Sequence, residues 1–229
     1  MQVGSARHDE YGKYKGGKKG DQTGHEVETQ AFYMHKLGWV VIRAKRTDMA
    51  IALANAMITA CFNPNIGYAQ DDRYGVVNNG VETKTKVNCD CSSLVRACIK
   101  KAANKDVGDF TTVSEMSVLK KSGLFEEPFI YKNEKDTPLF MGDILVTKTK
   151  GHTVIVTSGK KRKEDGYYKC YTGTSSSIVN ALSSVGEKDT SYKHRKLIAS
   201  SNGISNYSGT AKQNTTLLVL LKQGRLKKA

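Results

Sequence analysis

The segment NCDCSSLVRACIK, residues 88–100, decides the fold class of this chain. In this segment and just after it, apolar side chains recur at the spacing of one helical face, at Cys91, Leu94, Val95, Cys98 and Ala102. Asp90 comes directly before them and is a residue type preferred at helix N-caps. The pattern therefore predicts a helix that begins at Cys91. A thiol in the first turn faces free N–H groups and the positive end of the helix dipole, which favour a thiolate, while the charge of Asp90 opposes it.

A second segment places a histidine at the start of a strand. Alternating apolar residues predict strands over 143–147 and 152–158, joined by a turn around 149–151. His152 shares a face with Val154, so we expect its ring at the rim of a buried surface. A cysteine and a histidine on different elements are the minimum for a thiolate–imidazolium pair. In such a pair the thiolate attacks a carbonyl and the imidazolium protonates the leaving amine.

The five cysteines do not form a metal-binding pattern. Cys89 and Cys91 are spaced C-x-C rather than C-x-x-C, and no second Cys or His pair follows at zinc-finger spacing. An odd number of cysteines in a chain of 229 residues favours reduced thiols over a disulfide framework. We therefore expect neither a metal nor another cofactor.

Residues 1–40 are rich in glycine and charge and predict a flexible or substrate-lining loop. The stretch GKYKGGKKGDQTG partly matches a phosphate-binding loop, but Lys19 stands where Ser or Thr would bind magnesium, and no apolar strand precedes it. We therefore reject a nucleotide site there. The next segment, 47–62, is apolar nearly all round and predicts a buried helix.

The net charge of +14 implies a polyanionic partner, which could be nucleic acid, anionic lipid or an anionic wall polymer. The basic runs KKRK and RLKK lack interleaved aromatic residues, which argues against nucleic acid. No apolar run reaches the length of a membrane helix, and the N-terminus shows no apolar signal-peptide core. We expect a monomer that folds in the cytoplasm and does not insert into a membrane.

The last part of the chain predicts a small helical bundle. The segments SSSIVNALSSVG, SYKHRKLIASSNG and TAKQNTTLLVLLKQG each begin with Ser or Thr and end in Gly. Residues 167–229 also carry a net charge of +8. We predict an α+β catalytic domain over 1–166 with an antiparallel sheet, followed by a small all-α module over 167–229. The alternative is a helical subdomain packed on the catalytic domain.

Two motifs resemble a known family. DCSSLV, residues 90–95, resembles the cysteine signature of the NlpC-type papain-like peptidoglycan hydrolases, which include the related CHAP enzymes, and GDIL…GHTVIV, residues 142–156, resembles their histidine signature. The stretches GKYKGGKKGDQTGHEV and NIGYAQDD resemble phage endolysins of Gram-positive hosts, and 167–229 resembles a wall-binding module of clostridial lysins. This resemblance implies a papain-like fold and release to the cell wall through a holin pore.

The resemblance also assigns roles to residues. It implies that Cys91 is the nucleophile and His152 the general base and acid. The family often adds a polar residue on the next strand to orient the imidazole, but 167–172 holds no His, Asn or Gln. That residue is then either absent or supplied by the N-terminal segment, for which the candidates are Asp21, Gln22 and Glu26. A tyrosine upstream of the cysteine commonly assists, and Tyr68 is the candidate here.

The implied activity is hydrolysis of an amide bond in the stem peptide of bacterial peptidoglycan, with anionic wall polymers as further partners. The alternative bond is the muramoyl–L-alanine amide. Two non-enzymatic alternatives remain. The protein could be a non-catalytic wall-binding protein or a nucleic-acid-binding protein.

Overall fold

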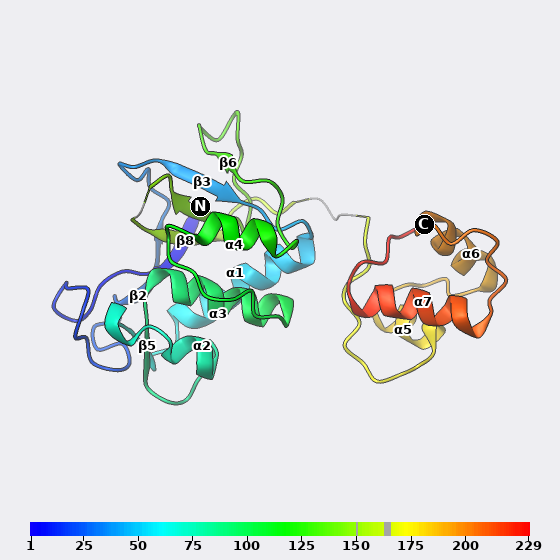
Figure 1. Cartoon of the computed structure of the whole chain (residues 1–229), viewed down its shortest axis with the longest axis horizontal. Helices are drawn as coiled ribbons and strands as arrows, with labels where there is room; N and C mark the ends of the chain where they lie inside the picture. Colours follow the sequence, from blue (N-terminus) through cyan, green and yellow to red (C-terminus); the bar gives the residue numbers. More distant parts are fainter. Residues whose placement is uncertain (150, 163–165) are drawn as a thin grey trace. The chain divides into compact units, whose positions relative to one another are not determined.

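The computed structural model describes residues 1–149, 151–162 and 166–229. The chain divides into two compact units, Met1–Lys163 and Glu164–Ala229, called unit 1 and unit 2 below (Figure 1). The boundary predicted after residue 166 falls close to this division. The boundary residues 163–165, and residue 150 of the turn predicted around 149–151, lie outside the described residues.

Unit 1 is built on a six-stranded sheet in the order β2-β1-β8-β7-β3-β6, in which every pairing is antiparallel. Its strands are β1 (Gln2–Ala6), β2 (Val27–Ala31), β3 (Trp39–Ile42), β6 (Phe129–Ile130), β7 (Ile144–Thr147) and β8 (Thr153–Ser158). A separate parallel pair joins β4 (Ile66–Tyr68) to β5 (Val87–Cys89). The fold is thus mixed α/β with a mostly antiparallel sheet.

The helices of unit 1 gather beside the large sheet, where Figure 1 shows α1, α3 and α4 together. They are α1 (Thr47–Cys61), α2 (Gly75–Asn79), α3 (Cys91–Ala103) and α4 (Glu115–Lys121), with a short 3₁₀ turn at Gln70–Asp72. Both α1 and α3 pack against β8 and against each other. Their apolar residues, such as Leu53 and Leu94, form one core with Ile155 of β8. The opposite face of the sheet forms a second core around Trp39 and Val154.

The predicted helices over 47–62 and from Cys91 are confirmed, as are the two strands around 143–147 and 152–158. The loop predicted over residues 1–40 is wrong in part, because this segment contains β1, β2 and the start of β3. These strands are short, and β1 is held by pairing with β8 from the far end of unit 1. Local periodicity carries little signal for a strand whose partner is so distant in sequence.

Unit 2 contains the helices α5 (Ile178–Ser184), α6 (Tyr192–Ser201) and α7 (Ala211–Lys222). Each begins at a side-chain cap, from Ser177, Ser191 and Thr210 respectively. The unit has its own apolar core, which includes Leu182, Ile198, Leu217 and Leu221. A core of its own lets unit 2 bury apolar surface without help from unit 1.

The segment 167–172, where the family pattern would place the strand after the histidine, belongs to unit 2. Tyr168 and Tyr171 are buried in the core of that unit, and Tyr167 forms an isolated antiparallel bridge with Lys227. In the large sheet of unit 1, the strand that pairs with β8 on this side is β1 instead. Among the described residues, no helix has both the length and the apolar character to cross a membrane.

Candidate active site

Cys91 is the first residue of α3 and lies in a tightly capped helix start. The Asp90 Oδ1 atom accepts a hydrogen bond from the Ser93 backbone N–H at 2.6 Å, and the Ser93 Oγ accepts one from the Asp90 N–H at 2.8 Å. This reciprocal capping box confirms Asp90 as the N-cap and fixes the backbone next to the thiol. Cys91 itself is 8% exposed, so one side of the residue reaches the surface.

The thiol of Cys91 is protonated at rest. Burial raises the pKa of Cys91 to about 12, and the nearby carboxyl groups of Asp90 and Glu115 act in the same direction. Backbone N–H groups of Thr153 and Ser92 donate to the sulfur and oppose the rise. Desolvation and two acidic neighbours thus outweigh the helix terminus that the sequence suggested as a source of thiolate.

His152 comes directly before β8 and is anchored through its backbone. Its N–H donates to the Thr147 Oγ1 at 3.0 Å, and its carbonyl accepts from the Thr147 N–H at 3.0 Å. The ring Nε2 lies 3.3 Å from the Ser5 Oγ. The pKa of His152 is lowered to about 4, chiefly by burial and to a smaller extent by positive charge at His35 and Arg7. The imidazole is therefore neutral near pH 7 and free to accept a proton.

Thr153 links the two predicted residues. It follows His152 in the chain, and its backbone N–H is the group that donates to the Cys91 sulfur. Helix α3 packs against β8, so the N-terminus of the helix and the first residues of the strand meet. The structure therefore brings the neighbourhoods of Cys91 and His152 together at one end of β8. Their pKa shifts favour a neutral thiol and imidazole at rest rather than the ion pair that the sequence suggested.

Tyr68 also lies in this neighbourhood. It ends β4, in register with Cys89 of β5, and it is 2% exposed. Burial raises its pKa, and the Cys91 thiol group is the next largest cause. The Tyr68 hydroxyl accepts a hydrogen bond from the Gln70 Nε2 at 3.1 Å. The tyrosine named from the sequence is thus placed close to Cys91.

Asp21, Gln22 and Glu26 hold the N-terminal loop and do not contact the His152 ring in the described structure. The Asp21 carboxylate accepts from the Thr23 and Gly24 backbone N–H groups at 3.0 and 2.7 Å. The Gln22 side chain donates to backbone carbonyls of its own loop. These contacts close a turn.

Glu26 reaches the site indirectly. It is fully buried, and its carboxylate accepts from the backbone N–H groups of Gln22 at 2.8 Å and of Tyr68 at 3.1 Å. Burial raises the pKa of Glu26. It therefore ties the loop to β4 and supports the position of Tyr68.

Sequence reasoning missed Ser5, the residue whose side chain meets the imidazole. It lies on β1, is 1% exposed, and reaches His152 because β1 runs antiparallel to β8. The N-terminal segment does supply a polar partner, but from its first strand rather than from its loop. The stretch QVGSA has no alternation of polar and apolar residues, so the sequence held no clear local signal for this strand.

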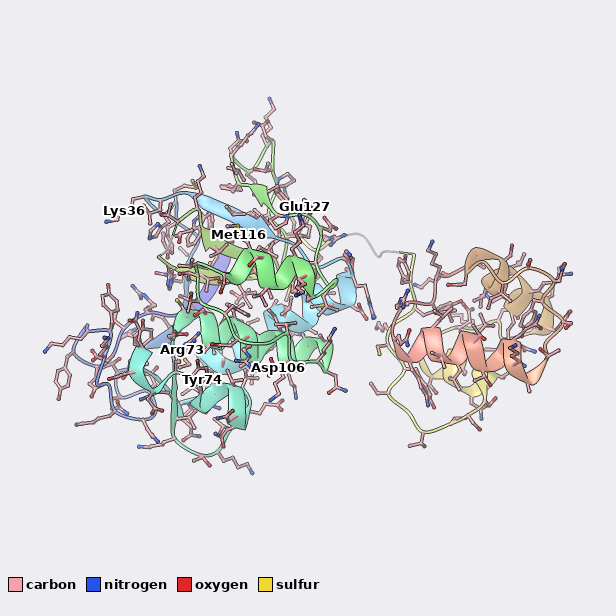
Figure 2. All side chains as sticks on the ribbon, viewed as in Figure 1. Lys36, Arg73, Tyr74, Asp106, Met116 and Glu127 are labelled. Carbon is pink, nitrogen blue, oxygen red and sulfur yellow. The ribbon has the colours of Figure 1, made fainter. Side chains whose placement is uncertain are left out.

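Arg73 is a second residue that the sequence did not indicate. Its Nε lies 2.8 Å from the Asp90 Oδ2, and its Nη2 donates to the Ser92 Oγ at 3.0 Å and to the Phe110 carbonyl at 2.7 Å. Figure 2 shows Arg73 and Tyr74 together in the region of α2 and α3. The guanidinium offsets part of the negative charge that Asp90 places beside Cys91.

The Gly-Asp pair of the second motif has a structural role. A Cβ atom at Gly142 would lie 2.0 Å from the Ala50 carbonyl oxygen, and the residue has a φ of +90°. The Asp143 carboxylate accepts two bonds from the Arg43 guanidinium, at 2.9 and 2.7 Å. This bidentate pair fastens the start of β7 to β3, and so fixes the hairpin that presents His152.

No group of three or more His, Cys, Asp or Glu side chains capable of holding a metal occurs within 1–149, 151–162 and 166–229. Cys89, the other half of the C-x-C pair, is fully buried, and its thiol donates to the Gly67 carbonyl at 3.4 Å. It faces away from solvent and holds β5 against β4.

Comparison with known proteins adds a family. Residues 3–163 match the family model described as the endolysin-like domain. A 54-residue stretch is 48% identical to the L-alanyl-D-glutamate peptidase of Listeria phage A118, covering 24% of this chain and 19% of that protein. The chain thus spans about a fifth of the length of that relative. No solved structure matches the chain.

Proposed function

The chain belongs to the endolysin-like domain family, and from this membership we propose that it is a peptidoglycan hydrolase that cleaves an amide bond of the stem peptide with Cys91 as nucleophile. The name of the Listeria phage relative, an L-alanyl-D-glutamate peptidase, supports the stem peptide as the substrate. The short match between the two proteins assigns no catalytic residue.

One observation carries the cysteine-dependent mechanism. Cys91 opens a helix, its sulfur contacts the N–H of Thr153, and Thr153 is preceded by a neutral histidine. A nucleophile on a helix N-terminus beside a base at the start of an antiparallel strand supports a papain-like arrangement. The acidic, cationic and aromatic groups around it, Asp90, Arg73 and Tyr68, supply the polar surroundings of an enzyme site.

The reaction proceeds in two halves. His152 accepts the thiol proton as the Cys91 sulfur attacks the amide carbonyl, which forms a C–S bond and a tetrahedral oxyanion. The C–N bond then breaks as His152 passes that proton to the leaving amine, and a thioester remains on the enzyme. Water attacks the thioester with His152 as base, so the acid product leaves and the thiol is restored.

The N-terminus of α3 would stabilise the negative charge of the tetrahedral oxyanion. The first N–H groups of a helix have no partner within it, and they carry the positive end of its dipole. We therefore propose the Cys91 backbone N–H as a donor to the oxyanion. Because the resting pair is neutral, His152 acts as a general base during attack rather than as a preformed imidazolium.

For unit 2 we propose a wall-binding role. It has its own core, and residues 167–229 carry a net charge of +8, which suits anionic wall polymers. A second binding site on one chain raises the local concentration of the enzyme on its insoluble substrate.

The test of the activity is digestion of purified Gram-positive peptidoglycan, with mass spectrometry of the released fragments. New amino termini within the stem peptide are expected. Free L-alanine amino termini together with intact glycan would instead indicate the muramoyl–L-alanine amide. Cys91→Ser should abolish fragment release, and Cys89→Ser should retain most of it. The reverse result would overturn the assignment of the nucleophile.

A further inference from the structure

A buried carboxyl group outside the Cys91–His152 pair has a direct route to it. Glu115 is the first residue of α4 and is fully buried. Its Oε1 accepts a hydrogen bond from the Thr153 Oγ1 at 2.8 Å. Its Oε2 has no hydrogen-bond partner among the described residues. Buried carboxyl oxygens are usually bonded, so this arrangement calls for a physical reason.

The bond to Thr153 connects Glu115 with the nucleophile. The side chain of Thr153 is held by Glu115, while the backbone N–H of the same residue donates to the Cys91 sulfur. Helix α4 thereby reaches the end of β8 that carries His152. A change at Glu115 alters both the rotamer of Thr153 and the charge that the thiol experiences.

The other charged groups around Glu115 do not neutralise it. Asp90 on α3 is an acid and is already paired with Arg73 through the Nε–Oδ2 contact of 2.8 Å. Cys91 gains negative charge as it gives up its proton, and the ring Nε2 of His152, directly before β8, lies 3.3 Å from the Ser5 Oγ. None of the ion pairs within the described residues includes Glu115.

We propose that Glu115 is a positioning residue, which in its protonated form holds Thr153 against Cys91 and by its ionisation suppresses formation of the Cys91 thiolate. The proposal rests on the proposed function of Cys91. Protonated Glu115 adds no charge beside the sulfur. Ionised Glu115 adds a second carboxylate to that of Asp90, and two like charges near the thiol oppose a third.

The electrostatics of the carboxyl group agree with this geometry. The pKa of Glu115 is raised to about 8, chiefly by burial; the hydrogen bond from Thr153 opposes the rise, and the negative charge of Asp90 adds to it. Glu115 is therefore neutral around pH 7 and ionises in weakly alkaline solution. Between about pH 8 and 10 the thiolate reactivity of Cys91 should therefore rise less steeply with pH than that of a simple cysteine.

The first experiment measures the thiol without using activity. The full chain is alkylated with iodoacetamide across pH 6–10, and mass spectrometry follows the peptide that contains Cys91. In Glu115→Gln, which keeps the neutral shape and cannot ionise, the rate at pH 9 should exceed that of the wild type by about tenfold, the effect of one pKa unit. Glu82→Gln, at an exposed acid paired with Lys101, is the matched control and should follow the wild type.

The second experiment measures hydrolysis of a soluble muropeptide. Wild-type kcat should decline above about pH 8, the value at which Glu115 ionises. In Glu115→Gln the decline should move to higher pH, with KM unchanged because Glu115 lies behind Thr153. Equal pH profiles and equal alkylation rates in the two proteins would overturn the proposal.

A further variant guards against a folding defect. Thr153→Val removes the hydroxyl that stabilises ionised Glu115, so the alkaline decline should move to higher pH here as well. Thr153→Ser keeps a hydroxyl, so its decline should begin at the same pH as in the wild type. Circular dichroism confirms that each variant is folded. If Cys91→Ser retains hydrolysis, the proposed function fails, but the alkylation rates still report whether Glu115 controls the thiol. If Cys91→Ser is inactive and Glu115→Gln is unchanged, only the role of Glu115 fails.

Discussion

Units 1 and 2 differ in what they bury. Every buried polar or charged residue in the described structure belongs to unit 1, including Asp90, Glu115 and Asp143. Unit 2 buries aliphatic side chains and three tyrosines, Tyr168, Tyr171 and Tyr207, and keeps its charged groups nearer the surface. Burying a polar group without a partner destabilises a fold. The buried polar groups of unit 1 therefore need specific partners, which an apolar core does not.

Two of the buried acids in unit 1 are paired with arginines next to the candidate site. The Asp143 pair with Arg43 fixes the hairpin before His152, and the Asp90 pair with Arg73 fixes the helix start at Cys91. In unit 2 the corresponding interactions join a core tyrosine to a more exposed acid, as between the Tyr168 hydroxyl and the Glu187 carboxylate. The difference agrees with the roles proposed for the two units, which are catalysis for unit 1 and wall binding for unit 2.

The largest expected effect is on the base of unit 1. His152→Ala should lower kcat/KM on a soluble muropeptide by about 10²- to 10⁴-fold, the usual contribution of general acid–base catalysis. His194 of unit 2, whose Nε2 lies 3.3 Å from the Glu187 carboxylate, is the matched control. His194→Ala should leave cleavage of the same soluble substrate unchanged. Comparable losses in both variants would contradict the division of roles between the units.

A second effect concerns the stability of the helix start. Asp90→Ala removes the N-cap and leaves Arg73, only 11% exposed, without its nearest carboxylate. Breaking a partly buried pair in this way should cost about 3 kcal/mol. The single tryptophan, Trp39, is fully buried in unit 1, so its fluorescence in a urea titration reports that unit alone.

Asp90→Asn is the control that separates the two contributions. It keeps an oxygen that can cap α3 but removes the charge. The loss should therefore be smaller than for Asp90→Ala. A loss below about 1 kcal/mol in Asp90→Ala would mean that the pair with Arg73 does little for the fold.

The pH dependence of unit 1 provides a third prediction. Burial lowers the pKa of His152 from 6.5 to about 4, so the fold favours the neutral ring. The stability from this preference is complete above pH 6.5 and is lost as the pH falls through about 4, because the unfolded chain binds the proton more readily. Its size is about 3 kcal/mol.

The measurement is the difference between two urea titrations of Trp39 fluorescence, at pH 7 and pH 4, for the wild type and for His152→Asn. Acidic groups titrate equally in both proteins and cancel in the comparison. The variant should lose less stability than the wild type on acidification. An identical loss would show that the imidazole of His152 is as accessible to protons in the folded state as in the unfolded one.

The sequence predicted those elements of unit 1 whose residues show a helical spacing or a strand alternation within the element itself. The start of α3 follows from Asp90 and the helical spacing behind Cys91, and the strands around His152 follow from alternation. The partners of these residues come from elsewhere in the chain. Ser5 meets His152 only because β1 pairs with β8, and no local rule indicates that pairing.

The same reason explains why Arg73 and Glu115 were missed. Arg73 lies in a loop with ordinary charged neighbours, and its contact with Asp90 depends on how α2, which follows it, packs against α3. Glu115 occupies the first turn of a helix, where an acid is expected at the surface, and only the packing of α4 buries it. Unit 2 was easier to predict, because its caps and its helical spacings are local.

A fourth prediction concerns separation of the two units. Fragment 1–166 should cleave soluble muropeptides, because Cys91 and His152 both lie within it, but its affinity for intact walls should fall by about 10²-fold through loss of the second contact. Fragment 167–229 should fold by circular dichroism and sediment with walls. Salt should weaken that sedimentation if its charge of +8 carries the binding.

An unfolded fragment 167–229 would contradict an independent unit 2. Salt-resistant sedimentation would point instead to recognition of a specific glycan or peptide. Wall binding by fragment 1–166 equal to that of the full chain would remove the proposed role of unit 2 altogether.

The smallest effect tests whether unit 2 is stabilised by local contacts. The Thr210 Oγ1 accepts from the Gln213 backbone N–H at 3.3 Å, and the Gln213 Oε1 accepts from the Thr210 N–H at 3.3 Å. Thr210→Ala should cost fragment 167–229 about 1 kcal/mol, the usual value of an N-cap. For a unit of this size that loss lowers the melting temperature by about 4–8 °C. Thr216→Ala, in the exposed middle of the same helix, should not lower it, because alanine is the better helix former. If both variants melt alike, the cap adds nothing to unit 2, and its stability comes from the apolar core around Leu217 and Leu221.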